Sequence, residues 1–246
     1  MITENIEECT HTIPLNDATT LSNLCYPDRA GCSGILASLS GSGIDRLCYA
    51  PGRGQYPGVI GKGHSSIVAL ALYRGSPVAV KIRRTDSKRE SLRLEGRRLL
   101  QASVHGATPR PYYFDDNVIV MEYVRGPHLV EYIDVDPVYA VEEALLAARA
   151  LDCAYILHEE LNRPWRHVRF TSVRGKALIL DLDSAHRGCG NVVKLVSGLL
   201  SRFHGGVSFL RGMRELLREY SNGCSYDLYY LIFDKIMDFL RGLYAG

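Results

Sequence analysis

One lysine stands in the middle of an apolar run, VAVKI at residues 78–82. A charged amine in such a strand is costly unless an anion lies beside it. Further along, Glu95 lies at spacings of three and four from Leu92 and Leu99, which puts a carboxylate on the core-facing side of a helix. We therefore predict that Lys81 pairs with Glu95 and that the pair serves the phosphates of a nucleotide. The alternative is that Lys81 points to solvent from the polar face of an alternating strand.

A glycine-rich turn, GKGHSS at residues 61–66, lies between two apolar runs that are typical of strands. This setting differs from the strand–helix setting of the Rossmann and Walker motifs, because a hairpin backbone can fold over a triphosphate. Serine replaces the third glycine of such a motif, and a simple β-hairpin is the alternative. The candidate nucleotide contacts in this turn and in the strand after it are Gly61, Lys62, Gly63, Ser66 and Val68.

The segment MEYVRG at residues 121–126 runs from an apolar strand into a glycine turn. Backbone N–H and C=O groups that leave a strand at such a turn need partners outside the strand. We expect backbone groups of Glu122 and Val124 to bind the edge of an adenine ring, with Met121 behind the ring.

Two aspartates follow another apolar run, in LDLDS at residues 180–184. Carboxylate oxygens at the end of a strand are suited to magnesium, which prefers oxygen ligands. Asp181 is the first candidate ligand and Asp183 the second. The alternative is that both are surface acids on an edge strand.

Taken in order, GKGxxSIV, VAVK, a helix glutamate and MEYVRG resemble the N-terminal lobe of the protein-kinase superfamily. The atypical archaeal branches are the most similar, namely the RIO kinases, the small kinase of the KEOPS tRNA-modification complex and the predicted archaeal serine/threonine kinases. The resemblance spans roughly residues 56–203. It implies an α+β, two-lobed fold that binds ATP between a small β-rich lobe and a reduced helical lobe.

The resemblance also implies tasks for residues in the second half of the chain. HEEL at residues 158–161 stands where kinases have their catalytic loop, which makes Glu160 the residue that accepts the substrate proton. His167, in NRPWRHV, stands nearest to the metal-binding asparagine of the family. Asp181 matches the metal-binding aspartate, with His167 and Asp183 as further candidate ligands of Mg²⁺ or Mn²⁺.

The implied activity is transfer or hydrolysis of the γ-phosphate of ATP, with a protein serine or threonine, the protein itself or water as acceptor. Asn191 follows Asp183 by only eight positions, and no Ala-Pro-Glu sequence comes after it. The region with which conventional kinases dock peptides is therefore missing, which favours ATP handling over protein phosphorylation. A non-catalytic nucleotide-binding scaffold is the alternative, because the family's catalytic aspartate and its asparagine are both replaced.

The order of the segments predicts an N-terminal extension at residues 1–50 with short helical pieces, a β-rich lobe at 51–124 and a helical lobe at 125–246. The stretch PGRGQYPG at 51–58 indicates the first boundary. Within the lobes we predict strands at 56–63, 65–73, 77–84 and 116–124, helices at 86–103 and from the Asp136-Pro137 cap to Leu157, a hairpin around Arg174-Gly175-Lys176, and helices from Asn191 onward.

The composition is that of an ordinary globular protein: 246 residues, 46% hydrophobic and 23% charged, with a net charge of +2 that requires no polyanionic partner. Basic residues gather at 81–98, so contact with RNA or the ribosome through this segment is an alternative function. The N-terminus lacks a signal-peptide pattern and no apolar stretch is long enough to span a membrane. We therefore expect a cytoplasmic protein without a membrane partner.

The chain has seven cysteines and no CxxC pair. The odd number argues against a secreted disulfide framework, and the missing pairs argue against a zinc ribbon. Cys9, Cys25, Cys32 and Cys48 cluster near the N-terminus. We expect buried thiols, or disulfides if the source is a hyperthermophile, with a metal site as the lesser alternative.

Overall fold

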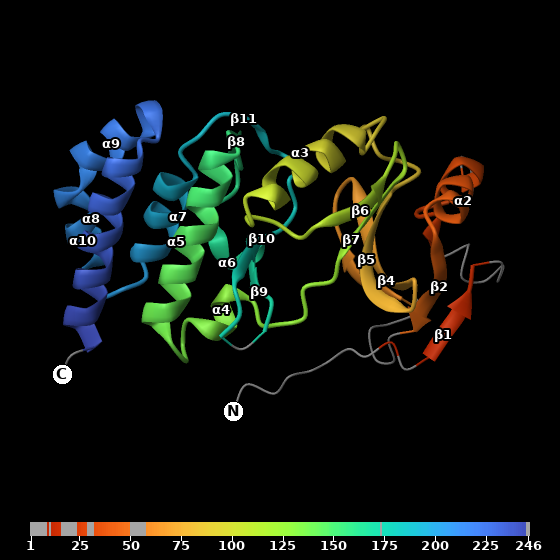
Figure 1. Ribbon diagram of the computed structural model, residues 1–246, viewed down its shortest axis with the longest axis horizontal. Coiled ribbons are helices and arrows are strands. Elements are labelled where there is room, and N and C mark those ends of the chain that lie inside the picture. Colours follow the sequence, from red (N-terminus) through yellow and green to blue (C-terminus); the bar gives the residue numbers. More distant parts are fainter. Residues whose placement is uncertain are drawn as a thin grey trace. The chain divides into compact units, whose positions relative to one another are not determined.

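The computed structural model describes residues 9, 11–15, 24–28, 32–49, 58–172 and 174–244 (Figure 1). They form two compact units. The sheet unit comprises the described residues up to Leu100 together with Arg110–Tyr123, and the helical unit comprises Gln101–Pro109 and the described residues from Val124 onward. The chain thus belongs to the mixed α+β class that the sequence predicts.

The sheet unit is built on one antiparallel sheet (Figure 1). Its strand order is β1-β2-β4-β5-β7-β6, and β3 pairs with β4 beside this path. The strands predicted around the glycine turn, around Lys81 and before the MEYVRG segment are all present. The strand bounds are β1 (His11–Pro14), β2 (Ile44–Tyr49), β3 (Val59–Lys62), β4 (Ser66–Tyr73), β5 (Ser76–Arg83), β6 (Pro111–Phe114) and β7 (Val118–Glu122).

One face of this sheet carries the hydrophobic core of the unit. Alternate residues of β4, β5 and β7 point to that face, including Ala69, Val80 and Val120, all of them buried. Helix α2 (Cys32–Gly41) adds Ile35 and Leu39 to the same cluster. This alternation leaves the opposite face of the sheet to Lys81 and its neighbours.

The segment expected as an N-terminal extension supplies α2, β1 and β2 to the sheet unit. The prediction of helical pieces is therefore wrong for the two strands, which have no clear alternation. Strand β2 gains its hydrogen bonds from β4, and β1 gains its own from β2. The predicted boundary at 51–58 lies outside the described residues except for Gly58. Strand β6 is a further element that the sequence pattern did not predict.

Helix α3 (Arg93–Val104) begins later than the predicted start at residue 86. The hydroxyls of Ser87 and Ser91 accept hydrogen bonds from the backbone N–H groups of Arg89 (3.1 Å) and Arg93 (3.0 Å). Serine turns of this kind compete with helix formation. The helix therefore starts only after Ser91.

The helical unit is arranged around α5 (Pro137–Cys153), against which α7 (Asn191–Leu200), α10 (Tyr226–Tyr244) and β10 (Ala177–Ile179) pack (Figure 1). Two short antiparallel pairs, β8 with β11 and β9 with β10, complete it. The remaining bounds are α4 (Leu129–Tyr132), β8 (Ile156–Leu157), α6 (Pro164–His167), β9 (Val168–Phe170), β11 (His186–Arg187), α8 (Gly206–Gly212) and α9 (Arg214–Gly223).

The predicted start of α5 is confirmed and its predicted end is wrong. The Asp136 carboxylate accepts a hydrogen bond from the Tyr139 N–H at 3.1 Å, and Pro137 occupies the first turn. The helix stops at Cys153 and not near Leu157, because Tyr155 adopts a left-handed conformation (φ 54°) that a helix cannot continue through. This early end releases the residues after it into β8 and the HEEL segment.

Six cysteines form disulfides among the described residues: Cys9–Cys48, Cys25–Cys32 and Cys189–Cys224. Cys153 is an exposed thiol. Of the two states expected for Cys9, Cys25, Cys32 and Cys48, disulfides are present and buried thiols are not. The sequence did not reveal the pairings, because partners up to 39 residues apart meet only in the folded chain. Each closed loop reduces the conformational freedom of the unfolded state.

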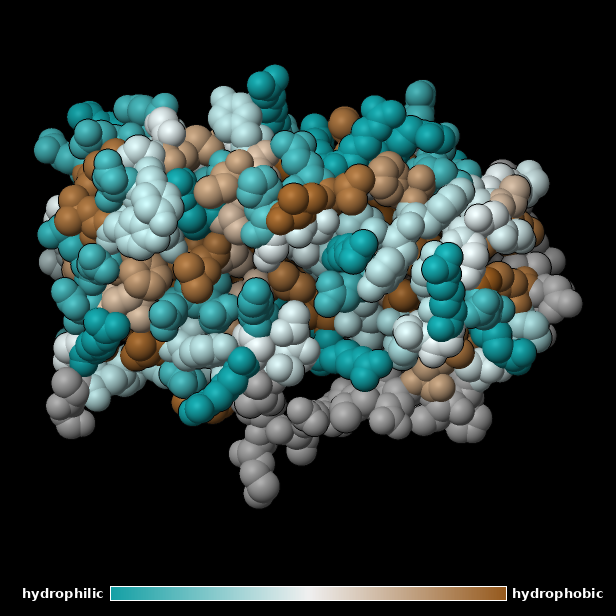
Figure 2. Space-filling view, in the orientation of Figure 1, coloured by the Kyte–Doolittle hydropathy of each residue, from teal (hydrophilic) through white to brown (hydrophobic). Residues whose placement is uncertain are grey.

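No helix in the described part of the chain is long and apolar enough to cross a membrane. On the face shown in Figure 2, hydrophobic residues form small patches separated by hydrophilic ones. Such scattered patches are usual for a protein surface and need no partner to cover them.

We predict that Gly96→Ala destabilises the protein although alanine is the better helix former. A Cβ at Gly96, in α3, would overlap the Phe114 ring of β6, and overpacking of this kind costs about 1–3 kcal/mol. The matched control is Gly242→Ala in α10, where nothing lies within 4 Å of the added Cβ. That variant should gain up to about 1 kcal/mol. Urea unfolding measures both, and equal effects would contradict close packing at Gly96.

Candidate functional site

The predicted ion pair between Lys81 and Glu95 is confirmed. The Lys81 Nζ lies 2.6 Å from the Glu95 Oε1, and the two side chains are only 5% and 4% exposed. The alternative of a solvent-facing lysine is therefore wrong. Arg89 donates from its Nη1 to the other oxygen, Oε2, at 3.2 Å, so one carboxylate holds two cations. Glu95 lies in the first turn of α3, where the helix dipole favours a negative charge.

Apolar side chains surround Lys81 on its face of the sheet. The strand register places Val68 and Ile119 directly beside Lys81, and it places Leu70 and Met121 beside Ala79, one step along the same face. Val68 and Met121 are only partly buried. A flat apolar surface next to a buried ammonium group is suited to a ligand with a planar ring and an anionic group.

The glycine turn between β3 and β4 is tied to its neighbours by Tyr26 and Arg84. The Gly63 N–H donates to the Ser66 carbonyl at 2.8 Å, and Arg84 donates to the Gly63 carbonyl at 3.1 Å. The Lys62 Nζ lies 3.5 Å from the centre of the Tyr26 ring. Its hydrogen bond and charge lower the pKa of the Tyr26 hydroxyl. Gly61 and Lys62 belong to β3.

Ser66 and Glu122 are less available to a ligand than the sequence suggests. Ser66 is 5% exposed, so its hydroxyl is turned away from solvent. The backbone N–H of Glu122 donates to the Arg110 carbonyl at 2.9 Å, so it is not open to adenine as expected. Among the expected backbone contacts, the Glu122 carbonyl and Val124 stay candidates.

His158 is a buried, neutral histidine at the start of the HEEL segment. Its Nδ1 accepts a hydrogen bond from the Glu160 N–H at 3.1 Å, so the proton is on Nε2, which lies 3.3 Å from the Leu180 carbonyl. Burial lowers the pKa of His158, and the neighbouring His167 lowers it further. The ring therefore shapes the loop and does not act as a cation.

Leu180 links the HEEL segment to His167 and Asp181, two of the three candidate metal ligands. Its N–H donates to the His167 carbonyl at 2.7 Å, while its carbonyl faces the His158 Nε2. The next residue, Asp181, has a left-handed backbone (φ 62°), which is unusual for a residue other than glycine. Such strained positions are concentrated at functional sites. The Asp181 side chain is exposed.

Glu160 and His167 face each other across this loop, with 3.7 Å between the Glu160 Oε2 and the His167 Nε2. His167 is buried, and its Nε2 has no hydrogen-bond partner among the described residues. Burial lowers the pKa of His167, although the carboxylates of Asp181 and Glu160 act in the opposite direction. The three predicted residues Glu160, His167 and Asp181 are thus close enough to influence one another.

The two adjacent glutamates have different surroundings. Glu159 binds the Lys194 Nζ at 2.7 Å and the His186 Nε2 at 3.1 Å, and the bond from Lys194 lowers the pKa of its carboxyl group. Glu160 makes neither contact, and its side chain is 53% exposed. Glu160 is therefore the glutamate with the more accessible carboxylate, and its catalytic role stays a prediction.

Sequence reasoning missed the buried residue that supports this loop, Asp152. Its Oδ1 accepts hydrogen bonds from the N–H of Gly190 (2.7 Å) and from the N–H and Nδ2 of Asn191 (2.8 and 2.7 Å). Its Oδ2 accepts from the Val192 N–H (3.2 Å) and the Tyr220 hydroxyl (2.8 Å). An aspartate in the apolar stripe of α5 was the available signal.

Asn191 transmits this support to the HEEL segment. Its Oδ1 accepts from the His158 N–H at 2.9 Å, and its Nδ2 donates to the Ile156 carbonyl at 2.7 Å. Because Asp152 fixes Asn191 at the start of α7, the loop has a rigid base. Burial, together with Asp152, raises the pKa of Tyr220, which keeps its proton on the bond to Asp152.

No group of three or more His, Cys, Asp or Glu side chains that could hold a metal ion exists within the described ranges. Magnesium, however, is commonly held by one or two carboxylates together with substrate phosphates and water. The exposed Asp181 and the partly buried Asp183 fit that kind of site. His167 fits it less well in this conformation, because its Nε2 is buried.

Comparison with models of known protein families finds no match, and no curated protein matches the chain.

We predict that Asp152→Ala destabilises the protein by roughly 3 kcal/mol, because it leaves several buried donors without an acceptor. The matched control is Asp238→Ala on α10, whose side chain is 78% exposed and which should change the free energy of unfolding by less than about 0.5 kcal/mol. Urea unfolding compares the two. A small effect of Asp152→Ala would mean that water replaces the carboxylate.

The two buried histidines predict a pH dependence of stability. Both have pKa values below the usual 6.5, so the unfolded chain binds protons more readily. Their contribution to the free energy of unfolding is present above about pH 6.5. It is lost as the pH falls through the lower pKa values of the folded state, with a slope of at most about 1.4 kcal/mol per pH unit for each histidine. The free energy of unfolding should fall as the pH is lowered from 7.5 to 5, and it should fall less steeply in the His158→Gln variant than in wild type. Identical slopes would contradict this origin.

Proposed function

We propose that this protein binds ATP with a divalent metal ion and transfers or hydrolyses the γ-phosphate, as an atypical, two-lobed member of the protein-kinase superfamily. The observation that carries the proposal is the buried pair of Lys81 and Glu95. A buried ion pair is often no more stable than well-packed apolar residues in its place. A buried lysine in this position therefore points to a task beyond stability, and binding of phosphate is a task for which its ammonium group is suited.

The surroundings of Lys81 support a nucleotide as the ligand. An adenine ring would lie on the apolar face formed by Val68, Ala79 and Met121, with the Glu122 carbonyl at its edge. Lys81 would then orient the α- and β-phosphates, with Glu95 fixing its position. The turn that contains Gly61, Lys62 and Gly63 would cover the phosphates with its backbone, as in the RIO kinases and the small KEOPS kinase that the sequence resembles.

In the helical unit, Asp181 and Asp183 would hold Mg²⁺ or Mn²⁺ through their oxygens. When bound, the ion would supply positive charge that stabilises the transferring phosphoryl group. Glu160 would accept the proton of the nucleophile, because its carboxylate is accessible while that of Glu159 is bound by Lys194. The acceptor would be a protein serine or threonine, the protein itself or water.

A non-catalytic nucleotide-binding scaffold is the second candidate, and His167 is the observation that favours it. The family's metal-binding asparagine has no amide equivalent here, and the His167 Nε2 is buried. If His167 keeps this conformation, the metal has fewer ligands than in the family. ATP binding without turnover would be the signature of such a scaffold.

Contact with RNA through the basic segment 81–98 is not favoured. Most of its cations are engaged within the sheet unit, which reduces the charge that they offer to a phosphate backbone. The pairs are Lys81 and Arg89 with Glu95, Arg83 with Asn117, Arg84 with Asp86, and Arg93 with Asp116.

We predict that Lys81→Ala weakens ATP binding at least about tenfold and abolishes turnover, because it removes the buried ammonium group from the nucleotide face. Glu95→Gln should have a milder effect of the same kind. The control is Lys88→Ala, an exposed lysine in the same basic segment. Calorimetric titration with ATP and a phosphate-release assay measure the two quantities, with circular dichroism as the test of folding. Unchanged affinity and turnover in a folded Lys81→Ala variant would refute the proposal.

We also predict that Asp181→Asn and Glu160→Gln fail in different ways. Asp181→Asn should lose metal-dependent ATP affinity and turnover together, since a metal ligand acts in the ground state and in the transition state. Glu160→Gln should bind ATP and metal normally and slow turnover by roughly 10²- to 10⁴-fold, the usual range for removal of a general base.

Glu159→Gln is the matched control for Glu160→Gln, because it changes the neighbouring carboxylate in the same way. It should disturb the surface contacts with Lys194 and His186 and leave turnover within a few-fold of wild type. The reverse result, in which Glu159→Gln has no turnover and Glu160→Gln is active, would shift the catalytic assignment by one residue. Full activity of both variants would favour the scaffold.

A further inference from the structure

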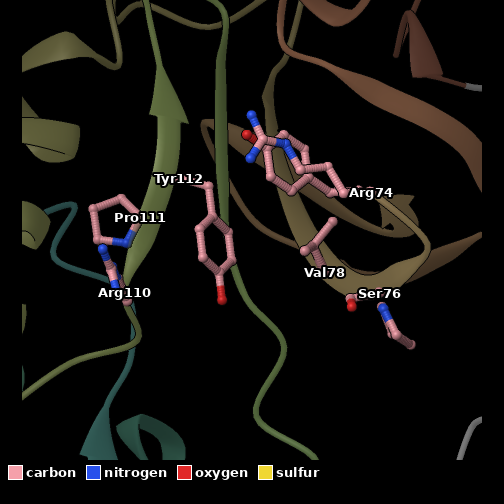
Figure 3. Close-up of a pocket in the computed structure, with 8 residues that line it drawn as sticks. Arg74, Ser76, Val78, Arg110, Pro111 and Tyr112 are labelled. Carbon is pink, nitrogen blue, oxygen red and sulfur yellow. The ribbon is translucent and has the colours of Figure 1, made fainter.

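The sheet unit contains a pocket with a volume of about 380 Å³ that the proposed activity does not use (Figure 3). Arg74, Ser76 and Val78 line it from the hairpin between β4 and β5, and Arg110, Pro111 and Tyr112 line it from the start of β6. Its volume is near the lower end of the usual range for small-molecule sites, about 300–1,000 Å³.

This pocket lies at the hairpin end of β5, and neither Lys81 nor its strand neighbours Val68 and Ile119 line it. Val78 follows the alternation of β5 and lies on the face opposite to Ala79. Ser76 shares the face of Val78, and Tyr73 shares it too because it pairs with Ser76. Successive residues of a strand point to opposite faces, so Tyr73, Ser76 and Val78 project away from the face of Lys81.

Pro77 and Pro111, which also line the pocket, belong to the Lys81 face, because Pro77 alternates with Val78 and Pro111 pairs with Met121. A ligand in this pocket would therefore lie at the end of the sheet and would not cover Lys81.

Two arginines of the pocket form no ion pair with a carboxylate among the described residues. Arg74 and Arg110 are both exposed, and neither side chain forms an ion pair in the described part of the chain. Two carboxylates lie nearby, but both bind backbone. Asp45 accepts from the Gly75 N–H (3.2 Å), and Glu122 accepts from the Arg110 N–H (3.3 Å). The two guanidinium groups are thus available to an anionic ligand.

Arg74 occupies a backbone position that does not favour arginine. Arg74 and Gly75 are the two turn residues of the β4–β5 hairpin, and both have positive φ values (51° and 75°). Asn or Asp followed by Gly is the favoured pair in such a turn. An arginine is a strained choice for its backbone, so what it adds here is the guanidinium group, 5.3 Å from the centre of the Tyr73 ring.

The aromatic wall of the pocket is built from Tyr73 and Tyr112. Their rings are stacked, with centroids 5.5 Å apart and planes 14° from parallel, and Tyr112 is 45% exposed. The stacked neighbour holds the Tyr112 ring in place, so one of its faces can receive a flat ligand without further ordering. Aromatic rings interleaved with arginines are the usual surface for unpaired bases and their phosphates.

We infer that this pocket binds one nucleotide unit, with the base stacked on Tyr112 and the phosphate held by Arg74 and Arg110. The unit is either a free mononucleotide or one residue of a single-stranded RNA. This inference does not depend on the proposed phosphotransferase activity.

Binding to the full-length protein tests it, with AMP, UMP, inorganic phosphate and a fluorescein-labelled oligouridine as the probes. Arg74→Asn, which suits the turn, Arg110→Gln and Tyr112→Ala should each weaken nucleotide binding about tenfold or more, whereas Tyr112→Phe should keep it. Arg218→Gln is the matched control, an exposed arginine on α9 of the helical unit. Tighter binding of the oligouridine than of UMP identifies RNA as the source, and equal binding identifies a mononucleotide.

Ultraviolet cross-linking of a 4-thiouridine-containing RNA to the wild-type protein locates the site without a variant. The cross-linked peptide should contain Tyr73 or Tyr112. The Lys81→Ala variant should keep this cross-link, which separates the pocket from the proposed ATP site. The inference is overturned if no probe binds at millimolar concentration, if cross-links fall only elsewhere, or if the pocket variants bind as wild type does.

Discussion

The buried carboxylate of Glu95 is the interaction on which the sheet unit depends. It holds Lys81 at 2.6 Å and Arg89 at 3.2 Å, and it is itself 4% exposed. A charge removed from water must be paired, so β5 and α3 have to meet at this point. Gly96, the next residue, lets α3 approach the Phe114 ring closely enough for that meeting. The ammonium group of Lys81 therefore lies on an apolar sheet face, where it attracts an anionic ligand more strongly than it would in water.

The helical unit also contains a buried carboxylate whose oxygens need partners, that of Asp152. Asp152 is 5% exposed and is satisfied by donors from the start of α7 and from Tyr220. Its carboxylate also lies where the dipole of α7 favours a negative charge. Asn191 extends the network to the backbone of His158, so that the loop which carries Glu160 is anchored to the core of the unit. Each unit thus uses one buried acid to position its candidate functional residues.

Two neutral histidines lie beside the carboxylates of the loop in the helical unit. His158 and His167 have lowered pKa values because both are buried, and their rings lie 4.6 Å apart. With both rings uncharged, the charged groups that act on the pKa of His167 are the carboxylates of Asp181 and Glu160, which raise it, and the guanidinium group of Arg166, which lowers it. An exposed acid beside a rigid, neutral base is compatible with proton transfer and with metal binding, which are the two tasks proposed for these residues.

The sequence alone determined the elements whose signal is local. Short apolar runs beside turn residues predicted β4, β5 and β7, and the helical spacing of Glu95 predicted its pairing with Lys81. Only the tertiary structure decided what depends on distant partners. The pairing of Cys9 with Cys48, the addition of β1 and β2 to the sheet and the network of Asp152 join segments far apart in the chain. A local pattern reports which face of an element is buried, but it carries no information about which distant groups will satisfy the polar atoms there.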